Sequence, residues 1–170
     1  GNRAAVIERR GIVGGVTAHT GTIPSRTRRE AVLYLCGWRE KGIYGRSHRV
    51  KANITAEDLL ARLHITVRHE IEIIQHQLSR NGVQVISGLA KFLDPHTVQV
   101  TSASGHAADY RAKAIVIATG TVPHRPGNIP FDDETIIDSD GLLQIKTIPR
   151  SMVVIGAGVI GLELGSVWKR

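Results

Sequence analysis

The segment SMVVIGAGVIGLE, residues 151–163, decides which fold the sequence predicts. Its apolar residues 152–155 are typical of a buried parallel strand. Three glycines follow in the G-x-G-x-x-G spacing of dinucleotide-binding loops: Gly156, Gly158 and Gly161. Residues 162–164, Leu-Glu-Leu, then favour a helix. The segment therefore predicts a strand, a phosphate-binding loop and the first turn of a helix.

Each glycine meets a physical need of such a loop. Gly156 permits the tight turn, Gly158 lets a pyrophosphate approach the backbone, and Gly161 lets the helix pack closely against its strand. The pyrophosphate is bound by N–H groups at the helix N-terminus, at Val159 and Ile160. The alternative is a glycine-rich turn without a ligand. The acidic residue that contacts the ribose is expected about 20 residues further on, outside the sequence, so NAD and NADP are not distinguished.

The composition indicates a globular protein, since 42% of the residues are hydrophobic and 22% are charged. No apolar run approaches the roughly 18 residues of a membrane span, and the N-terminus lacks the layout of a signal peptide. We therefore expect no membrane association. Cys36 is the single cysteine, which excludes an intrachain disulfide and favours a cytoplasmic location.

The formal charge of +7 raises nucleic-acid binding as an alternative. The basic residues are spread along the chain, however, and two Phe, three Tyr and two Trp offer few side chains for base stacking. A basic surface that attracts phosphorylated cofactors explains the charge as well. We therefore expect no nucleic-acid partner.

The N-terminal residues 4–7 are typical of a short buried strand, and the acidic Glu8 follows it. In a Rossmann unit, the second strand ends in a carboxylate that hydrogen-bonds a ribose, about 20 residues after the glycine loop. Glu8, with Arg9 beside it, is therefore a candidate for binding an adenosine, and the first glycine loop is expected before residue 1. An ordinary strand that ends in a solvated Glu explains the pattern equally well.

Two helices are predicted in the first half of the chain. The first begins at 22–24, Thr-Ile-Pro, where a hydroxyl cap precedes a proline in the first turn, and it ends at Gly37. We expect one of its faces to be buried, with Val32, Leu35 and Cys36. Before it, the Gly14–Gly15 pair lets the backbone pass close to a flat or phosphorylated group.

The second helix begins at Thr55, with Thr55 and Asp58 as a capping pair, and Asn81–Gly82 ends it. Its apolar residues recur at helical spacing and predict a packing face: Leu59, Leu60, Leu63, Val67, Ile71, Ile74 and Leu78. Three histidines on or beside it raise a metal site as an alternative: His64, His69 and His76. No two of them have the i, i+4 spacing of a ligand pair, so we expect no metal site.

Four further strands are predicted from apolar and β-branched runs, at 83–86, 90–93, 97–101 and 110–118. Turns at 94–96 and 102–105 separate them. Residues 121–130 hold three of the six prolines and indicate a connection between domains. Beyond it, residues 138–140, Asp-Ser-Asp, are expected to cap a short turn.

These motifs together resemble the pyridine nucleotide-disulfide oxidoreductases, flavoproteins such as dihydrolipoamide dehydrogenase. The resemblance rests on GG-x(6)-TIPS at 14–25, on Ala-Thr-Gly at 118–120 and on the second strand with its glycine loop. The usual motif of the family is GG-x-C-x(4)-C-IPSK, whose cysteines form a redox-active pair. Thr17 and Thr22 stand at the two cysteine positions here. The GTIPS form is similar to the soluble pyridine nucleotide transhydrogenases within the family.

The resemblance implies FAD and NAD(P) as cofactors, and hydride transfer from NADPH to NAD+ through FAD without a redox-active disulfide. Arg26 stands where the family has a lysine beside the flavin, and Glu163 matches the glutamate with which that lysine pairs. The implied FAD contacts are Glu8, Arg9, Gly14, Gly15, Thr17, Ser25, Arg26, Ala90, Ala118, Thr119 and Gly120. The implied NAD(P) contacts are Gly156, Gly158, Val159, Ile160 and Gly161.

The predicted fold is α/β. Residues 1–121 are expected to form part of a Rossmann-like FAD-binding domain with a small antiparallel β insertion, 122–150 a connection, and 151–170 the start of a Rossmann-like NAD(P)-binding domain. The resemblance also implies missing sequence at both ends and a homodimer formed through a C-terminal domain absent here. A truncated, non-catalytic remnant of a dihydrolipoamide dehydrogenase-like flavoprotein is the alternative.

Overall fold

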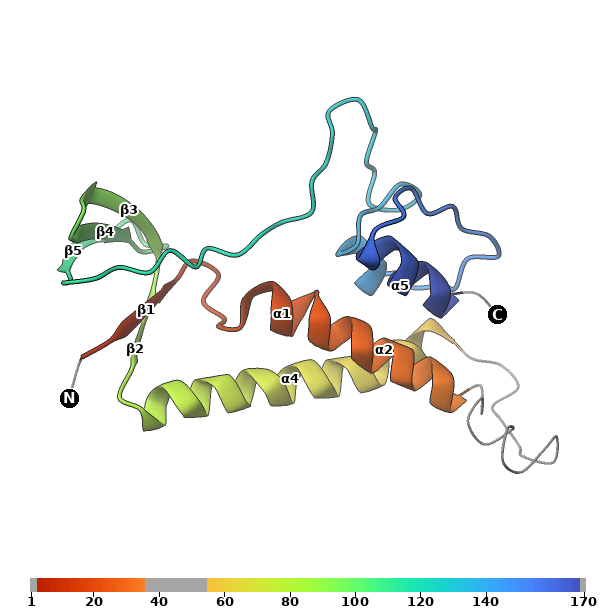
Figure 1. The fold of residues 1–170 in the computed structure, drawn as a ribbon, viewed down its shortest axis with the longest axis horizontal. Helices are drawn as coiled ribbons and strands as arrows, with labels where there is room; N and C mark the ends of the chain where they lie inside the picture. Colours follow the sequence, from red (N-terminus) through yellow and green to blue (C-terminus); the bar gives the residue numbers. More distant parts are fainter. Residues whose placement is uncertain (1–2, 36–54, 169–170) are drawn as a thin grey trace. The chain divides into compact units, whose positions relative to one another are not determined.

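The computed structural model describes residues 3–35 and 55–168, which form two compact units. The sheet unit comprises Gly1–Gly15 and His69–Gly120, and the helical unit comprises Val16–Arg68 and Thr121–Arg170. Figure 1 shows the elements in chain order. Mixed α/β structure is confirmed, while the predicted domain boundaries at 121 and 150 stay a prediction. Cys36 and Gly37, at the expected end of the first helix, lie outside the described residues.

A parallel strand pair lies in the sheet unit. It joins β1, Ala5–Glu8, to β2, Gln84–Ser87, in the register Ala5↔Gln84 to Glu8↔Ser87. Both strands lie one residue later than the sequence predicted. The chain leaves β2 through Gly88, whose N–H donates to the Glu8 carbonyl at 3.1 Å. The carboxyl end of β1, where a Rossmann fold binds its ligands, is therefore placed beside the start of the next strand.

The predicted antiparallel sheet is confirmed as β3, Leu89–Asp94, β4, Thr97–Thr101, and β5, Ala107–Arg111. It is small because both connections are tight turns, and β4 lies in the centre. Val98 and Val100 on alternate positions of β4 are buried, as the two-residue period of a strand requires. Their neighbours on the other face are polar, with the Gln99 amide donating to the Asp109 carboxylate at 3.1 Å.

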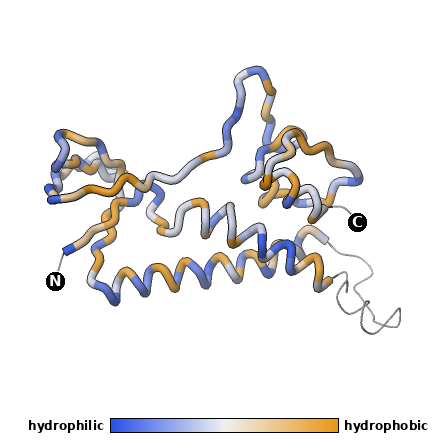
Figure 2. The backbone as a smooth tube through the Cα atoms, in the orientation of Figure 1, coloured by the Kyte–Doolittle hydropathy of each residue, from blue (hydrophilic) through white to orange (hydrophobic). Residues whose placement is uncertain are grey.

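The long predicted helix is confirmed as α4, Ala56–Arg80. Thr55 and Asp58 form the expected capping box: the Thr55 N–H donates to Asp58 Oδ2 at 2.9 Å, and the Asp58 N–H donates to Thr55 Oγ1 at 3.2 Å. Gly82 ends the helix at φ +64°. Hydrophobic and hydrophilic positions alternate along α4 at helical spacing (Figure 2), and Leu63 is buried at 3% exposure.

Replacing Thr55 with alanine is expected to lower the free energy of unfolding by about 1 kcal/mol, the usual loss for an N-cap side chain. Two of the hydrogen bonds in the capping box use the Thr55 hydroxyl, so both are lost. Urea unfolding followed by circular dichroism measures the change. Thr55→Ser, which keeps the hydroxyl, is the control, and an equal loss in both variants would contradict this role of the cap.

The helical unit contains α1, Gly15–His19, α2, Thr22–Leu35, and α5, Val159–Trp168, with a short 3-10 helix at Gly141–Leu143. The sequence predicted α2 and the start of α5 but not α1, which has five residues and begins at the second glycine of the Gly14–Gly15 pair. Helices α2 and α5 contact each other. No described helix is long and apolar enough to cross a membrane.

The buried face of α2 differs from the prediction. The positions that are buried are Pro24, Arg28 and Ala31. Val32 and Leu35, which were expected in the core, are only half-buried, and Cys36 lies outside the described residues. The apolar pattern failed here because a charged side chain occupies the centre of the inward face. Burial lowers the pKa of Arg28 to about 10, which leaves it charged at neutral pH.

Two predicted strands are wrong. The strand expected at 110–118 ends at Arg111 as β5, and the segment 152–155 has no strand structure. Val153 is 86% exposed and Ile155 is 89% exposed. Apolar runs become strands only when a neighbouring strand completes their hydrogen bonds, and within the described residues neither segment has such a neighbour.

A cluster of charged side chains organises the connection between residues 121 and 150. Arg125 donates from Nε to Asp138 Oδ2 at 2.7 Å, pairs with Asp133, and lies 5.0 Å from the centroid of the Phe131 ring. Asp138 Oδ1 accepts from the N–H groups of Asp140 and Gly141, at 3.0 and 2.9 Å. The predicted cap at 138–140 is therefore confirmed.

Asp132 is expected to titrate well below an ordinary carboxyl group. Its Oδ1 accepts from the backbone N–H groups of Ile136, Glu134 and Thr135, and the bonds to Ile136 and Glu134 lower its pKa most, to about 2. Because the pKa is lower in the folded state, the charged form stabilises the fold above about pH 4. That contribution is lost as the pH falls towards 2.

Carbon NMR of the Asp132 carboxyl group measures this titration directly. Between pH 4 and 2 we also expect Asp132→Asn to lose less stability than the unmodified protein, since the variant has no carboxylate to protonate. Titration of Asp132 at its ordinary pKa would contradict the three-bond geometry.

Candidate functional site

The glycine loop before α5 has the geometry that the sequence predicted for three of its positions. Gly156 has φ +118°, a conformation that side chains rarely adopt. A Cβ atom at Gly161 would lie 2.1 Å from the Gly156 carbonyl oxygen, so helix and loop meet without room for a side chain. A Cβ atom at Gly158 would meet nothing within 4 Å. Gly158 therefore faces open space, as the approach of a pyrophosphate requires.

Helix α5 begins at Val159, directly after this open position. The N–H groups of its first turn, including those of Val159 and Ile160, lack partners within the helix, and no acidic side chain lies in that turn. A negative ligand is favoured there by the helix dipole. Val154 also packs on this helix, because Cβ atoms at Gly161 and Gly165 would lie 3.3 and 3.2 Å from its methyl groups. The arrangement fits a diphosphate.

Glu8 lies at the carboxyl end of β1, where a ribose-binding carboxylate is expected. Its Oε1 accepts from the Arg10 N–H at 2.8 Å, and the side chain is half-buried. Arg9 is exposed. Ala90 lies in β3, two residues after the Gly88 N–H that bonds the Glu8 carbonyl. The Gly88 bond thus joins the end of β1, with Glu8, to the chain that enters β3, with Ala90, and their contact with FAD stays a prediction.

The Gly14–Gly15 pair has φ values of +113° and +54° and leads into α1. Thr17 is exposed on α1, while Thr22 is exposed at the start of α2. The Ser25 hydroxyl donates to the Thr22 carbonyl at 3.1 Å and so stabilises the first turn of α2. Neither position expected to carry a cysteine in this family has a thiol here.

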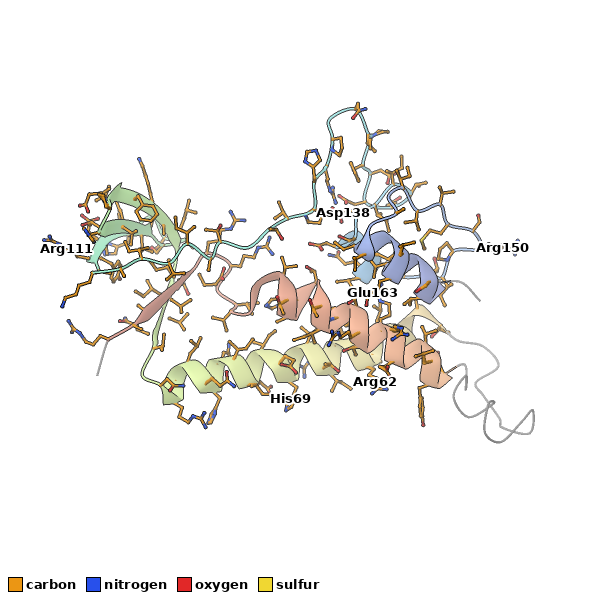
Figure 3. The ribbon with its side chains drawn as sticks, in the orientation of Figure 1. Arg62, His69, Arg111, Asp138, Arg150 and Glu163 are labelled. Carbon is orange, nitrogen blue, oxygen red and sulfur yellow. The ribbon has the colours of Figure 1, made fainter. Side chains whose placement is uncertain are left out.

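Arg26 and Glu163 lie on two helices that contact each other, α2 and α5. Arg26 is exposed, on the face of α2 away from the buried Arg28, because two residues correspond to about 200° around a helix. Glu163 is half-buried in the second turn of α5 (Figure 3). Within the described residues the two side chains form no ion pair, so their coupling stays a prediction.

The third candidate segment, Ala118–Thr119–Gly120, is irregular and exposed in the sheet unit. Gly120 has φ +71°, which marks a turn that suits glycine. Glu8, Arg9, Gly14, Gly15 and Ala90 belong to the same unit. Thr17, Ser25 and Arg26 belong to the helical unit together with the glycine loop and Glu163.

Sequence reasoning missed a basic hollow in the sheet unit, which His96, Arg111, Ala112 and Lys113 line. The Asp-Pro-His turn was recognised only as a turn, and the basic residues at the end of β5 were assigned to a longer apolar strand. An arginine and a lysine two residues apart, directly before the apolar run at 114–118, were the available signal. Among the described residues no three metal-ligating side chains gather at one place.

Comparison with known proteins defines the class. The family model of the pyridine nucleotide-disulphide oxidoreductases matches residues 5–170. The chain therefore belongs to this family. Its relatives include soluble pyridine nucleotide transhydrogenases from Mycobacterium tuberculosis (strain ATCC 25177 / H37Ra), with 48% identity, and from Yersinia enterocolitica, with 38% identity. Each alignment covers 99% of this chain and 36% of the relative, so the chain spans about a third of their length.

Solved structures give the same result for the fold. The crystal structure of LpdA from Mycobacterium tuberculosis matches 98% of this chain with a TM-score of 0.85, at 24% identity and over 36% of its own length. The HOCl-induced flavoprotein disulfide reductase RclA from Escherichia coli matches with a TM-score of 0.75 at 23% identity, over 34% of its length. At these identities the likeness concerns the fold, and it confirms the predicted α/β class.

Proposed function

We propose that this chain is part of an FAD-dependent oxidoreductase that passes hydride between NADPH and NAD+. The similarity to soluble pyridine nucleotide transhydrogenases, 48% over 99% of the chain, carries the proposal. The open Gly158 position before α5 supports it, since it leaves room for a diphosphate. The 1–121, 122–150 and 151–170 division into FAD-binding, connecting and NAD(P)-binding parts belongs to the same proposal.

Bound FAD supplies the hydride-transfer chemistry, and the protein supplies binding, orientation and charge. The loop at Gly156–Gly161 holds the pyrophosphate of the nicotinamide nucleotide on the N–H groups of α5. Glu8 hydrogen-bonds the adenosine ribose of FAD. Gly15 and Gly120 fit a closely approaching cofactor, because a Cβ atom at either would meet nothing within 4 Å.

Arg26 provides a fixed positive charge where negative charge develops during hydride transfer. Its guanidinium is a planar fork, which differs in shape from the point charge of a lysine. Glu163, on the helix that contacts α2, orients Arg26 or the nicotinamide. Both residues lie in the helical unit with the glycine loop.

Hydride transfer without a disulfide relay is favoured by the residues at positions 17 and 22. Both are threonine, and Cys36 is the only cysteine in the chain. A hydroxyl group cannot exchange with a disulfide, so these positions cannot relay electrons to a disulfide substrate. The proposed substrates are therefore the two nicotinamide nucleotides alone.

We also propose a cytoplasmic homodimer for the whole protein.

An NADPH-to-thio-NAD+ assay on the full gene product tests the proposal, with the flavin content measured by its visible absorption. We expect turnover that disappears when FAD is removed and returns when it is restored. Bound flavin without turnover would favour the non-catalytic alternative. A full gene product that binds no FAD would overturn the proposal.

A further inference from the structure

An open hollow of about 460 Å³ lies at the end of the antiparallel sheet. Its lining comes from the turn between β3 and β4 and from the residues at and after the end of β5. Three of the four lining residues carry basic side chains, His96, Arg111 and Lys113, and the fourth is Ala112. Figure 3 labels Arg111 beside the antiparallel sheet.

Hydrogen bonds fix the position of His96 in this hollow. Its N–H donates to Asp94 Oδ1 at 2.7 Å, and its carbonyl accepts from the Ala112 N–H at 2.9 Å. Its ring Nδ1 lies 3.2 Å from the Ala112 carbonyl oxygen. Because a carbonyl only accepts, Nδ1 carries the hydrogen of this bond. Nε2 is thus the ring nitrogen left for a ligand, in a ring that the turn already orients.

The two cationic side chains are also available. Within residues 3–35 and 55–168, the side chains of Arg111 and Lys113 form no ion pair or hydrogen bond with protein groups. Asp94, the acid on which the charge of Arg111 acts, is engaged by the turn: its pKa is lowered first by the His96 N–H bond and then by the Thr97 hydroxyl, and least by the charge of Arg111. Asp94 therefore orders the turn and forms no ion pair with Arg111 within the described residues.

We propose that His96, Arg111 and Lys113 form a binding site for a phosphate group, either free or carried by a small molecule. An arginine fork and a lysine point charge are the usual partners of phosphate oxygens. Nε2 of His96 is the acceptor of the neutral ring, so it adds a third polar contact by accepting from a phosphate hydroxyl or from a hydroxyl of the group that carries the phosphate. The volume of the hollow leaves space for the group that carries the phosphate. The site lies on the antiparallel sheet and uses none of the residues assigned to FAD or NAD(P).

Protection of Lys113 from acetylation, read by mass spectrometry of the full gene product, tests this site. We expect inorganic phosphate to slow acetylation of Lys113 but not of Lys91, which is on β3 and does not line the hollow. At about ten times the Kd, mass action predicts roughly tenfold slower labelling. Comparing AMP with inorganic phosphate shows whether the carrier group is also bound, because AMP then protects at lower concentration.

Arg111→Gln is expected to weaken the protection about tenfold, the usual effect of losing one charge-assisted bond. Arg80→Gln, at the exposed end of α4, changes the net charge equally and is expected to leave protection unchanged. Because both side chains are exposed, both variants should fold, which circular dichroism checks. Equal protection of Lys91 and Lys113, an equal loss in both variants, or no protection by either ligand would overturn the proposal. None of these readouts requires FAD or hydride transfer.

Discussion

Gly161→Ala is expected to weaken binding of NADPH by about a hundredfold or more, because it displaces the loop that holds the pyrophosphate. A Cβ atom at this position would lie 2.1 Å from the Gly156 carbonyl oxygen, and a backbone atom cannot turn aside as a flexible side chain can. Either the loop moves away from α5 or the helix starts later. We also expect a loss of about 1–3 kcal/mol in the free energy of unfolding, as in other overpacked sites.

Gly158→Ala is expected to weaken binding of NADPH without changing the stability of the fold. The added methyl group would meet nothing within 4 Å, so the fold and its stability are expected to stay unchanged. The same methyl group occupies the space that a pyrophosphate needs, and a loss of about tenfold in affinity is expected. The two substitutions are thus predicted to weaken NADPH binding for different reasons. Gly161→Ala clashes with the protein backbone, whereas Gly158→Ala clashes with the ligand.

Titration calorimetry with NADPH and urea unfolding measure the two effects on the full gene product. Gly127→Ala is the matched control, since its Cβ atom also meets nothing within 4 Å and it lies in the connection, away from the loop. NADPH affinity that is equal in Gly158→Ala and Gly127→Ala would show that no pyrophosphate approaches Gly158. Unchanged stability of Gly161→Ala would contradict the close contact between helix and loop.

Features that depend on neighbours in the sequence could be predicted, and α4 is the clearest case. Its start is fixed by a reciprocal pair three residues apart, Thr55 and Asp58, and its end by Asn81–Gly82. The helical spacing of the apolar residues between these two ends can be read from the sequence without knowing which element packs against α4. The glycine loop was predictable for the same reason, since turn, open approach and close packing are each set by one glycine.

Features that depend on distant partners were predicted less well. The apolar runs near 116 and 154 carry the composition of strands, but a strand also requires a neighbour, which sequence alone does not supply. Arg28 shows the opposite error, because a charged residue that looks suited to solvent is fully buried on α2. The basic hollow was missed since His96 and Arg111 are brought together only by the pairing of β4 with β5.

Arg26→Met is expected to lower the rate of NADPH-to-thio-NAD+ transfer by about a hundredfold, the scale of removing one preorganised charge from a reacting centre. Methionine keeps much of the length and volume of the side chain but not its charge. Because Arg26 is exposed on α2, no packing within the protein is lost, and the rate is expressed per bound FAD because Arg26 is itself a predicted FAD contact. Single-turnover reduction by NADPH, followed at the flavin absorption band, measures the step itself.

Two variants on the same helix make this result specific. Arg26→Lys keeps the positive charge and is expected to retain most of the rate, which a role in shape alone would not predict. Arg29→Met removes an equally exposed charge three residues further on and is expected to change the rate little. An equal loss in Arg26→Met and Arg29→Met would mean that the general basic surface of α2, rather than Arg26, assists the reaction.

The role of Glu163 follows from a double-mutant cycle. If Glu163 acts by orienting Arg26, Glu163→Gln lowers the rate about tenfold in the parent and has little further effect in Arg26→Met. If Glu163 instead contacts the nicotinamide, the two losses add, because each side chain then acts independently. The contact between α2 and α5 permits the first result, although no ion pair joins the two side chains within the described residues. Additive losses with unchanged NADPH affinity would therefore assign Glu163 to the nicotinamide and leave Arg26 to act alone.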